Sequence, residues 1–378
     1  MGVGDSAGTV LTRRAIDDVR ARIGDEYPAK PWWRVATADA IRHYAEGYGD
    51  VNPLFTDPEY GATTRNRAQV APPTFLYCGL SAGGSTGGVG LPGAFALHAQ
   101  DEWIWYRPTP EGTHLRGVQR LTSVEEKDSK WAGRVVHQVL STEFSDDNGE
   151  PLAVYRALVV RGDRGAARGS GKYEPKGYVP TRYTEAELKR IAADYDAETI
   201  RGNEPRYWED VHPGQSLGHV VKGPLAVRDI ICWWMGRGAP LLKAFRHWNN
   251  YVAEHPGIAI VDPDTNVADT PEAAHYDERL ARRSGVAARY DVGALRTAWC
   301  QHLLTNWCGD DGTVQSIRVR FYRPNYVGST SWVRGTVEAK SVEHGAHLVT
   351  CALEVKDERD NLHTSATAVV RLPSRAGA

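Results

Sequence analysis

A repeated stretch decides the fold of this chain: EWIWYRP at residues 102–108 is matched by VRFYRP at residues 319–324. In each copy a Tyr-Arg-Pro triplet ends an apolar or alternating run, and a glycine follows at Gly112 or Gly328. The two triplets lie 216 positions apart (322 − 106). Such runs, interrupted by turn residues, predict a strand, a turn and a second strand. Their recurrence within one chain indicates an internal duplication.

The duplication extends on both sides of this stretch. Residues 157–161 resemble residues 368–371, and a polar turn precedes each of them, at 146–149 and at 357–361. These turns predict hairpins that close two antiparallel sheets.

Upstream, residues 39–44 correspond to residues 229–234, and both predict the start of a helix. This offset is only 190 (229 − 39), so about 26 extra residues separate helix and strands in the second copy (216 − 190). We expect an inserted, partly helical segment near 241–271 that either walls a pocket or lies on the surface.

The length of 378 residues suits two domains of ordinary size. The repeat predicts a first half at 13–162, a linker at 163–205 and a second half at 206–373. Helices followed by antiparallel strands in each half predict an α+β fold.

Composition excludes several classes of protein. A net charge of −2 gives no field for a nucleic acid, and no apolar run is long enough to span a membrane. Because the N-terminus also lacks the apolar centre of a signal peptide, we expect a cytoplasmic protein. The spacing of the five cysteines predicts neither disulfides nor a metal site.

Residues 44–57, YAEGYGDVNPLFTD, suggest a family. They resemble the signature Y-A-x-x-x-G-D-x-N-P-x-H-x-D of MaoC-like (R)-specific enoyl-CoA hydratases and acyl dehydratases. Residues 71–74 resemble that family's turn into a long central helix, and residues 105–108 resemble its entry into the following strand. The resemblance implies a double hotdog, in which two antiparallel sheets each wrap around a long central helix.

The resemblance also implies a substrate and its partners. We expect an acyl thioester of coenzyme A or of a carrier protein, handled without a metal or a redox cofactor. We further expect either a homodimer or association with a partner hotdog subunit.

The catalytic pair of the family, an Asp and a His, is incomplete in each half. Asp50 matches the Asp of the signature, but Phe55 stands where the family has its His. In the second half His275 matches the His, while Thr270 stands five residues before it and Asp269 six. We therefore take His275, Asp50 and Asp269 as catalytic candidates, and both a rebuilt site and a decayed one stay open.

Four residues are candidates for substrate binding. The resemblance places Asn52 in the signature loop and puts Gly293 and Ala294 at the turn into the central helix, where a backbone N–H could face the thioester carbonyl. His98 precedes the first copy of the strand entry. Each has a plainer interpretation, as a turn residue, a packing residue or a solvated strand end.

Three functions are consistent with these features. The first is hydration or dehydration of enoyl or 3-hydroxyacyl thioesters by acid–base catalysis. The second is non-catalytic binding of acyl thioesters as a subunit of a hotdog complex. The third is thioester hydrolysis or isomerisation on the same fold, since a fold does not fix its chemistry.

Overall fold

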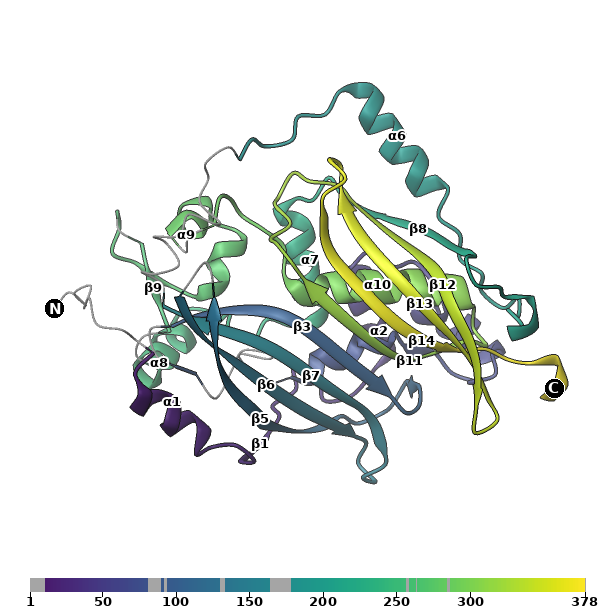
Figure 1. The fold of residues 1–378 in the computed structure, drawn as a ribbon, viewed down its shortest axis with the longest axis horizontal. Coiled ribbons are helices and arrows are strands. Elements are labelled where there is room, and N and C mark those ends of the chain that lie inside the picture. The colour runs from purple at the N-terminus through teal and green to yellow at the C-terminus, as the bar shows by residue number, and fades with distance from the viewer. Residues whose placement is uncertain are drawn as a thin grey trace.

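The computed structural model of this chain describes residues 11–80, 90–91, 94–129, 133–163, 178–255, 258–262, 264–283 and 286–377. Its main element is a curved ten-stranded sheet (Figure 1), in which every neighbouring pair is antiparallel and the order is β1-β5-β6-β7-β3-β11-β14-β13-β12-β8. The strands are β1 (Glu26–Pro28), β3 (Phe95–Trp105), β5 (Arg116–Ser129), β6 (Gly133–Ser145), β7 (Pro151–Gly162), β8 (Ser216–Lys222), β11 (Thr313–Phe321), β12 (Ser331–Glu343), β13 (Ala346–Asp357) and β14 (Leu362–Arg371).

The duplication is visible in the sheet. Strands β1 to β7 come from the first half and β8 to β14 from the second, and the halves join edge to edge where β3 pairs with β11. Both predicted hairpins are present: Asp146 accepts the amide N–H groups of Asn148 and Glu150 between β6 and β7, and Asp357 accepts that of Asn361 between β13 and β14. An Asp that binds backbone N–H groups a few residues ahead favours a tight turn.

The helices are α1 (Arg13–Arg20), α2 (Ala38–Gly47), α3 (Pro53–Thr56), α4 (Pro58–Thr63), α6 (Glu185–Asp196), α7 (Val227–Arg237), α8 (Arg246–Glu254), α9 (Glu278–Arg283) and α10 (Gly293–Cys308). The repeated helices predicted at 39–44 and 229–234 are α2 and α7, which pack against each other. Their backbones approach closely at two glycines, since a Cβ on Gly236 would lie 2.3 Å from the carbonyl oxygen of His43 and one on Gly47 would lie 2.9 Å from that of Cys232.

The long central helix of the second half is α10. Its residues are buried on all sides except at its first position, which is typical of a helix enclosed by a core. It ends at Gly309, whose φ of +72° suits the end of a helix. At the equivalent place in the first half lies a 3₁₀ helix, η1 (Pro73–Gly79), and residues 81–89 after it are outside the described part of the chain.

The inserted segment predicted near 241–271 holds α8 and a two-stranded sheet of β9 (Ile260–Val261) with β10 (Ala268–Asp269). The 3₁₀ helix η4 (Pro271–His275) and α9 follow this segment. Its first helix begins at Arg246, five residues later than residue 241, where the sequence placed it. In Figure 1 this segment lies at the end of the molecule where β3 begins.

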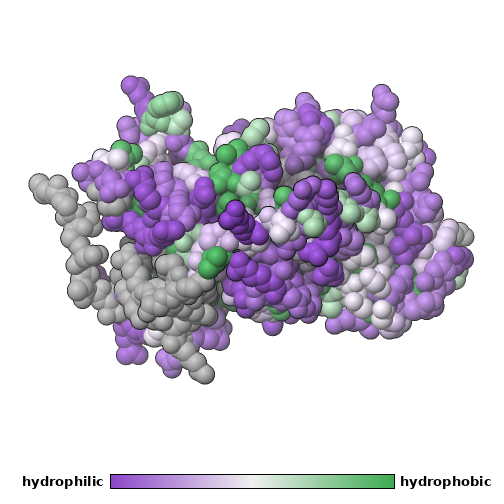
Figure 2. All heavy atoms as spheres, turned by 90° about the horizontal axis from the view of Figure 1, so that it is seen from above, coloured by the Kyte–Doolittle hydropathy of each residue, from purple (hydrophilic) through white to green (hydrophobic). Residues whose placement is uncertain are grey.

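One core is shared by the two halves. It joins Tyr44, Trp103 and Phe144 of the first half to Trp233 and Leu303 of the second. The face in Figure 2 is largely hydrophilic, with hydrophobic side chains in small separate patches. None of the described helices has the length and apolar character of a membrane span.

Candidate active site

The pairing of β3 with β11 creates two equivalent places at the junction of the halves. Ser316 lies opposite Ile104, and Arg320 lies opposite Gln100. Because the strands are antiparallel, the start of β3 meets the end of β11 at one place, and the end of β3 meets the start of β11 at the other. Helix α10 begins at the first place and ends at the second.

The start of α10 lies beside His98 and Phe321. A Cβ on Gly293 would lie 3.2 Å from His98 Nδ1 and 3.4 Å from the ring of Phe321, and no side chain caps the helix at Val292. The first N–H groups of a helix lack partners within it and form the positive end of its dipole. With Ala294 in the same first turn, these groups suit an oxygen that gains negative charge.

His98 is held by a buried carboxylate. Its Nε2 lies 2.6 Å from Oδ1 of Asp101. The same oxygen accepts from the hydroxyl of Tyr155 at 2.5 Å, and Oδ2 accepts from the hydroxyls of Tyr77 and Thr297 at 2.5 and 2.7 Å. Burial by itself would raise the pKa of Asp101, but the imidazole and the hydroxyl groups hold that pKa below its ordinary value. Asp101 is thus an ionised carboxylate.

These bonds fix the tautomer of the imidazole. A carboxylate only accepts hydrogen bonds, so neutral His98 carries its proton on Nε2 and keeps a lone pair on Nδ1. This Nδ1 is the atom nearest to the Cβ position of Gly293. A proton acceptor oriented by a buried carboxylate therefore faces the start of α10.

The sequence analysis missed Asp101, for a structural reason. Residues three apart on a regular strand point to opposite faces of the sheet. The register between β3 and β7 shifts between His98 and Gln100, which marks a bulge. The bulge turns the side chains of His98 and Asp101 to the same side of the sheet. The sequence around these residues has no pattern that predicts the bulge.

His275 lies against the segment that leads into α10. Its Nδ1 is 2.8 Å from the carbonyl oxygen of Tyr290, and the two rings are 4.5 Å apart. Its Nε2 lies 3.5 Å from Glu272 Oε2, so both ring nitrogens of His275 face oxygen atoms that only accept hydrogen bonds. Tyr290 precedes Gly293 by three residues, so both imidazoles contact one short segment.

Asp269 lies near His275 in the chain, but its carboxylate accepts hydrogen bonds from other groups. Its Oδ1 accepts from the hydroxyl of Tyr276 at 2.9 Å and from the backbone N–H of Thr270 at 2.7 Å. Within the described residues no hydrogen bond or ion pair joins Asp269 to His275. The direct pair that the family signature implied is not formed.

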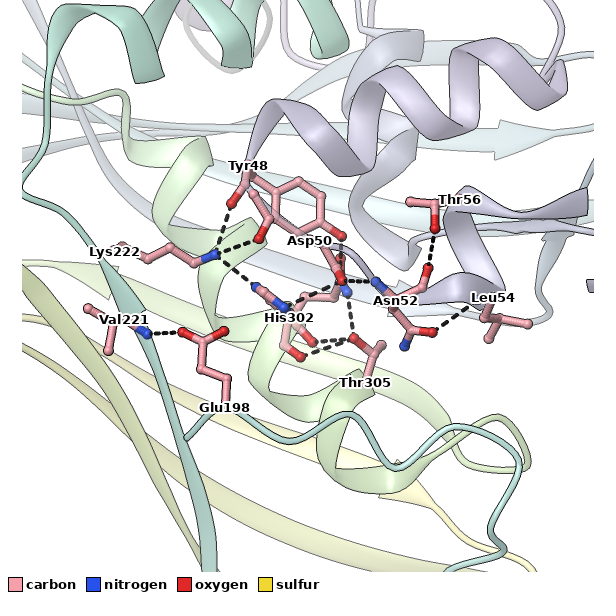
Figure 3. A network of polar contacts seen from close by, with 12 residues as sticks. Tyr48, Asp50, Asn52, Leu54, Thr56, Glu198, Val221, Lys222, His302 and Thr305 are labelled. Atoms are coloured by element: carbon pink, nitrogen blue, oxygen red, sulfur yellow. Dashed lines mark hydrogen bonds and ion pairs between the residues drawn. The ribbon is translucent and has the colours of Figure 1, made fainter. Parts of the chain in front are cut away.

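Asp50 lies in a buried network of polar contacts between the halves (Figure 3). His302 of α10 places Nε2 3.4 Å from Asp50 Oδ1, and Lys222 Nζ lies 2.9 Å from His302 Nδ1. The same ammonium group donates to the carbonyl oxygens of Tyr48 and Gly49 at 2.9 and 3.3 Å. Asp50 itself is 0% exposed.

Burial sets the ionisation of this network. It raises the pKa of Asp50 to about 6, although the N–H of Asn52, the hydroxyl of Tyr48 and the charge of Lys222 all lower it. Burial likewise lowers the pKa of Lys222 to about 8. It also lowers the pKa of His302 well below its ordinary value, and the charge of Lys222 adds to this effect.

Asp50 and Asn52 therefore do not join the other candidates. His302 follows Gly293 by nine residues, a rise of about 14 Å along the helix, so Asp50 lies far from the segment that His275 contacts. Asn52 is 1% exposed, and its Oδ1 accepts from the backbone N–H of Leu54 at 3.0 Å as the cap of α3. The structure places His98 beside Gly293 and His275 against Tyr290, three residues before Gly293, and it leaves Asp50 and Asn52 in the interior.

No group of three or more His, Cys, Asp or Glu residues within the described ranges could hold a metal ion.

Comparisons with known proteins agree with this fold. Residues 21–154 match the model of the family described as "FAS1-like, dehydratase domain region". A UPF0336 protein of Saccharopolyspora erythraea is 31% identical over 160 residues, which are 41% of this chain and 94% of that protein. A UPF0336 protein of Parafrankia is 33% identical over 129 residues, which are 32% of this chain and 81% of that protein.

Solved structures resemble the whole chain. A MaoC-like dehydratase superposes with a TM-score of 0.67 at 19% identity, covering 94% of this chain and 100% of its own. A conserved hypothetical protein of Mycobacterium tuberculosis, described as having a double hotdog fold, gives a TM-score of 0.56 at 11% identity and covers 96% of this chain and 99% of its own. The fold is thus the double hotdog that the sequence predicted. The chain belongs to the family of the UPF0336 proteins, and its residues 21–154 match the FAS1-like dehydratase region.

Proposed function

We propose that this protein adds water to, or removes it from, the α,β double bond of an enoyl or 3-hydroxyacyl thioester at the start of α10. The observation that carries the proposal is the Nδ1 lone pair of His98, fixed by Asp101 and directed at the uncapped helix start at Gly293. Proton transfer beside an oxyanion site is the chemistry that this reaction needs.

The proposed hydration conserves protons and electrons. Nδ1 of His98 takes a proton from water while the water oxygen bonds to the β-carbon. His275 supports the segment that leads into α10 through its contact with the carbonyl oxygen of Tyr290. The electrons of the double bond move towards the thioester oxygen, which the N–H groups of Gly293 and Ala294 stabilise. The imidazolium of His98 then returns its proton to the α-carbon, and dehydration is the reverse.

Asp101 is a positioning residue in this scheme. It does not touch the substrate, but it keeps the proton of His98 on Nε2 and stabilises the imidazolium that forms. Asp269 accepts from the hydroxyl of Tyr276, the neighbour of His275.

The decisive experiment is turnover of trans-2-enoyl-CoA substrates of varied chain and ring size by the purified protein, followed by loss of the enoyl absorbance. We expect His98→Gln to lower kcat about 100-fold or more, because acid–base groups contribute about 10²–10⁴ to rate. Asp101→Asn should lower kcat similarly while KM changes little. His114→Gln is the matched control, since His114 pairs with Asp147 at the surface and should keep full activity.

Two results would contradict the proposal: a wild-type protein that leaves every enoyl thioester unchanged, or a His98→Gln variant with wild-type kcat. Acyl-CoA binding without turnover would instead support the non-catalytic alternative. The unformed pair between Asp269 and His275 is the observation that keeps this alternative open.

A further inference from the structure

Arg237, the last residue of α7, has a guanidinium group that the surrounding protein leaves unbound. Among the described residues no hydrogen bond or ion pair engages this group. The side chain is half-buried: Nε is enclosed, whereas the two Nη groups of the described structure are not. Donors that are partly removed from water and lack an acceptor are costly. An anionic oxygen that reaches the Nη groups therefore forms bonds that the protein itself leaves unmade.

The guanidinium of Arg237 lies beside residues that support the candidate active site. Its carbon is 5.9 Å from the ring centre of Tyr77, whose hydroxyl donates to Asp101 at 2.5 Å. Three residues earlier on α7, the ring of Trp234 lies 6.1 Å from the ring of His275. The end of α7 thus contacts both the residue that binds Asp101 and the residue next to the entry into α10.

The groups around Arg237 do not balance its charge. Burial raises the pKa of Tyr44 and of Cys78, and the positive charge of Arg237 works against that rise without cancelling it. Both side chains are therefore neutral. The carboxylate of Asp101 lies beyond the hydroxyl of Tyr77 and already accepts from three hydroxyl groups and an imidazole. The negative end of α7 stabilises the cation at this position.

The part of a thioester substrate that comes near Arg237 follows from the proposed reaction. There the thioester oxygen lies at the N–H groups of Gly293, and the β-carbon lies at His98. From the β-carbon the acyl chain continues away from the sulfur, while the phosphates of coenzyme A lie at the other end of the pantetheine arm. An anionic group close to the reacting carbons therefore belongs to the acyl chain. The planar fork of an arginine matches a carboxylate.

We propose that Arg237 binds a carboxylate at the far end of the acyl chain, so that the substrate is the monothioester of a dicarboxylic acid. This inference deepens the proposed hydratase function and rests on it for the place of the thioester. Arg237 selects the acyl group and takes no part in proton transfer.

The test measures binding by calorimetric titration of the full chain with saturated thioesters, which need no turnover. Succinyl, glutaryl and adipyl thioesters are paired with butyryl, pentanoyl and hexanoyl thioesters of the same carbon number. Each is prepared on coenzyme A and on pantetheine, which has no phosphate. We expect at least one dicarboxylic thioester to bind about tenfold or more tightly than its neutral partner on both carriers, because hydrogen bonds to charged groups are strong.

Two variants assign the preference to its residue. Arg237→Gln removes the charge and should abolish the preference while the neutral thioesters bind as before. Arg228→Gln is the matched control, since Arg228 is an exposed arginine of the same helix that binds Asp229. It should keep the preference.

Three results would overturn the proposal. The first is no preference for the dicarboxylic member in any pair, or no binding of any thioester. The second is an equal loss of both members in Arg237→Gln, which would assign Arg237 to the support of the site. The third is a loss confined to the coenzyme A thioesters, which would assign Arg237 to a phosphate. If a variant fails to fold, the wild-type pairs on the two carriers still decide.

The outcome is distinguishable from failure of the proposed hydratase function. A preference for dicarboxylic thioesters without turnover of any enoyl thioester would support the role of Arg237 and contradict the hydratase. Turnover of neutral enoyl thioesters without any such preference would support the hydratase and contradict the role of Arg237.

Discussion

At the scale of single residues, environment assigns different roles to similar carboxylates. Asp101 and Asp50 are both 0% exposed. Three hydroxyls and an imidazole surround Asp101 and lower its pKa, whereas burial outweighs the contacts of Asp50 and raises its pKa to about 6. Asp101 can therefore orient a base, while Asp50 links the halves through His302 and Lys222.

This difference predicts a pH dependence of stability. The unfolded chain ionises Asp50 near its ordinary pKa of 3.8, but the folded chain keeps the proton until about pH 6. The folded state thus binds more protons between these values, so stability falls as pH rises through this window, by a few kcal/mol, on the order of 3. Asp50→Asn should remove this fall.

Urea unfolding at pH 4 and pH 7 measures the effect. The stability of the wild type relative to Asp50→Asn should decrease between the two pH values. Asp39→Asn, which removes an exposed carboxylate, is the control. A difference between wild type and Asp50→Asn that is the same at both pH values would contradict the assigned environment of Asp50.

At the scale of elements, α10 links the proposed chemistry to the fold. Its first residue must be small, because a Cβ on Gly293 would press on His98 and Phe321. Alanine favours helices over glycine by about 1 kcal/mol, so Gly293→Ala should not lower the melting temperature. We expect it to lower kcat/KM about tenfold or more by displacing His98.

Paired measurements of thermal unfolding and enoyl-CoA turnover test this expectation. Asn249→Ala, on the exposed surface of α8, is the control and should change neither quantity. Unchanged turnover in Gly293→Ala would show that the start of α10 does not contact the reacting group.

At the scale of the whole molecule, the halves share their core and their sheet. Thr297 of α10 donates to Asp101, and the hydroxyl of Thr74 donates to Gln301 of α10 at 2.8 Å. A fragment of residues 11–163 would expose the edge of β3 and the apolar surface around Trp103. Unpaired edges and large apolar patches favour aggregation.

We therefore expect this fragment to aggregate when produced alone, and to form a one-to-one complex with a fragment of residues 178–377 when the two are produced together. Size-exclusion chromatography with light scattering distinguishes these outcomes. A monomeric first fragment with cooperative unfolding would show that the halves are independent domains.

The sequence by itself determined the duplication, the hairpins and the repeated helices, because repeats, turn residues and periodicity are local properties of the chain. Its resemblance to a known family, carried by residues 44–57, predicted the double hotdog fold. The sequence also identified His98, His275, Gly293 and Ala294 as candidate site residues. Only the tertiary structure decided how they are used: the bulge after His98 brings Asp101 to its imidazole, and the docking of α10 and β8 encloses Asp50. Both depend on register and on contacts between residues far apart in sequence, which no local pattern encodes.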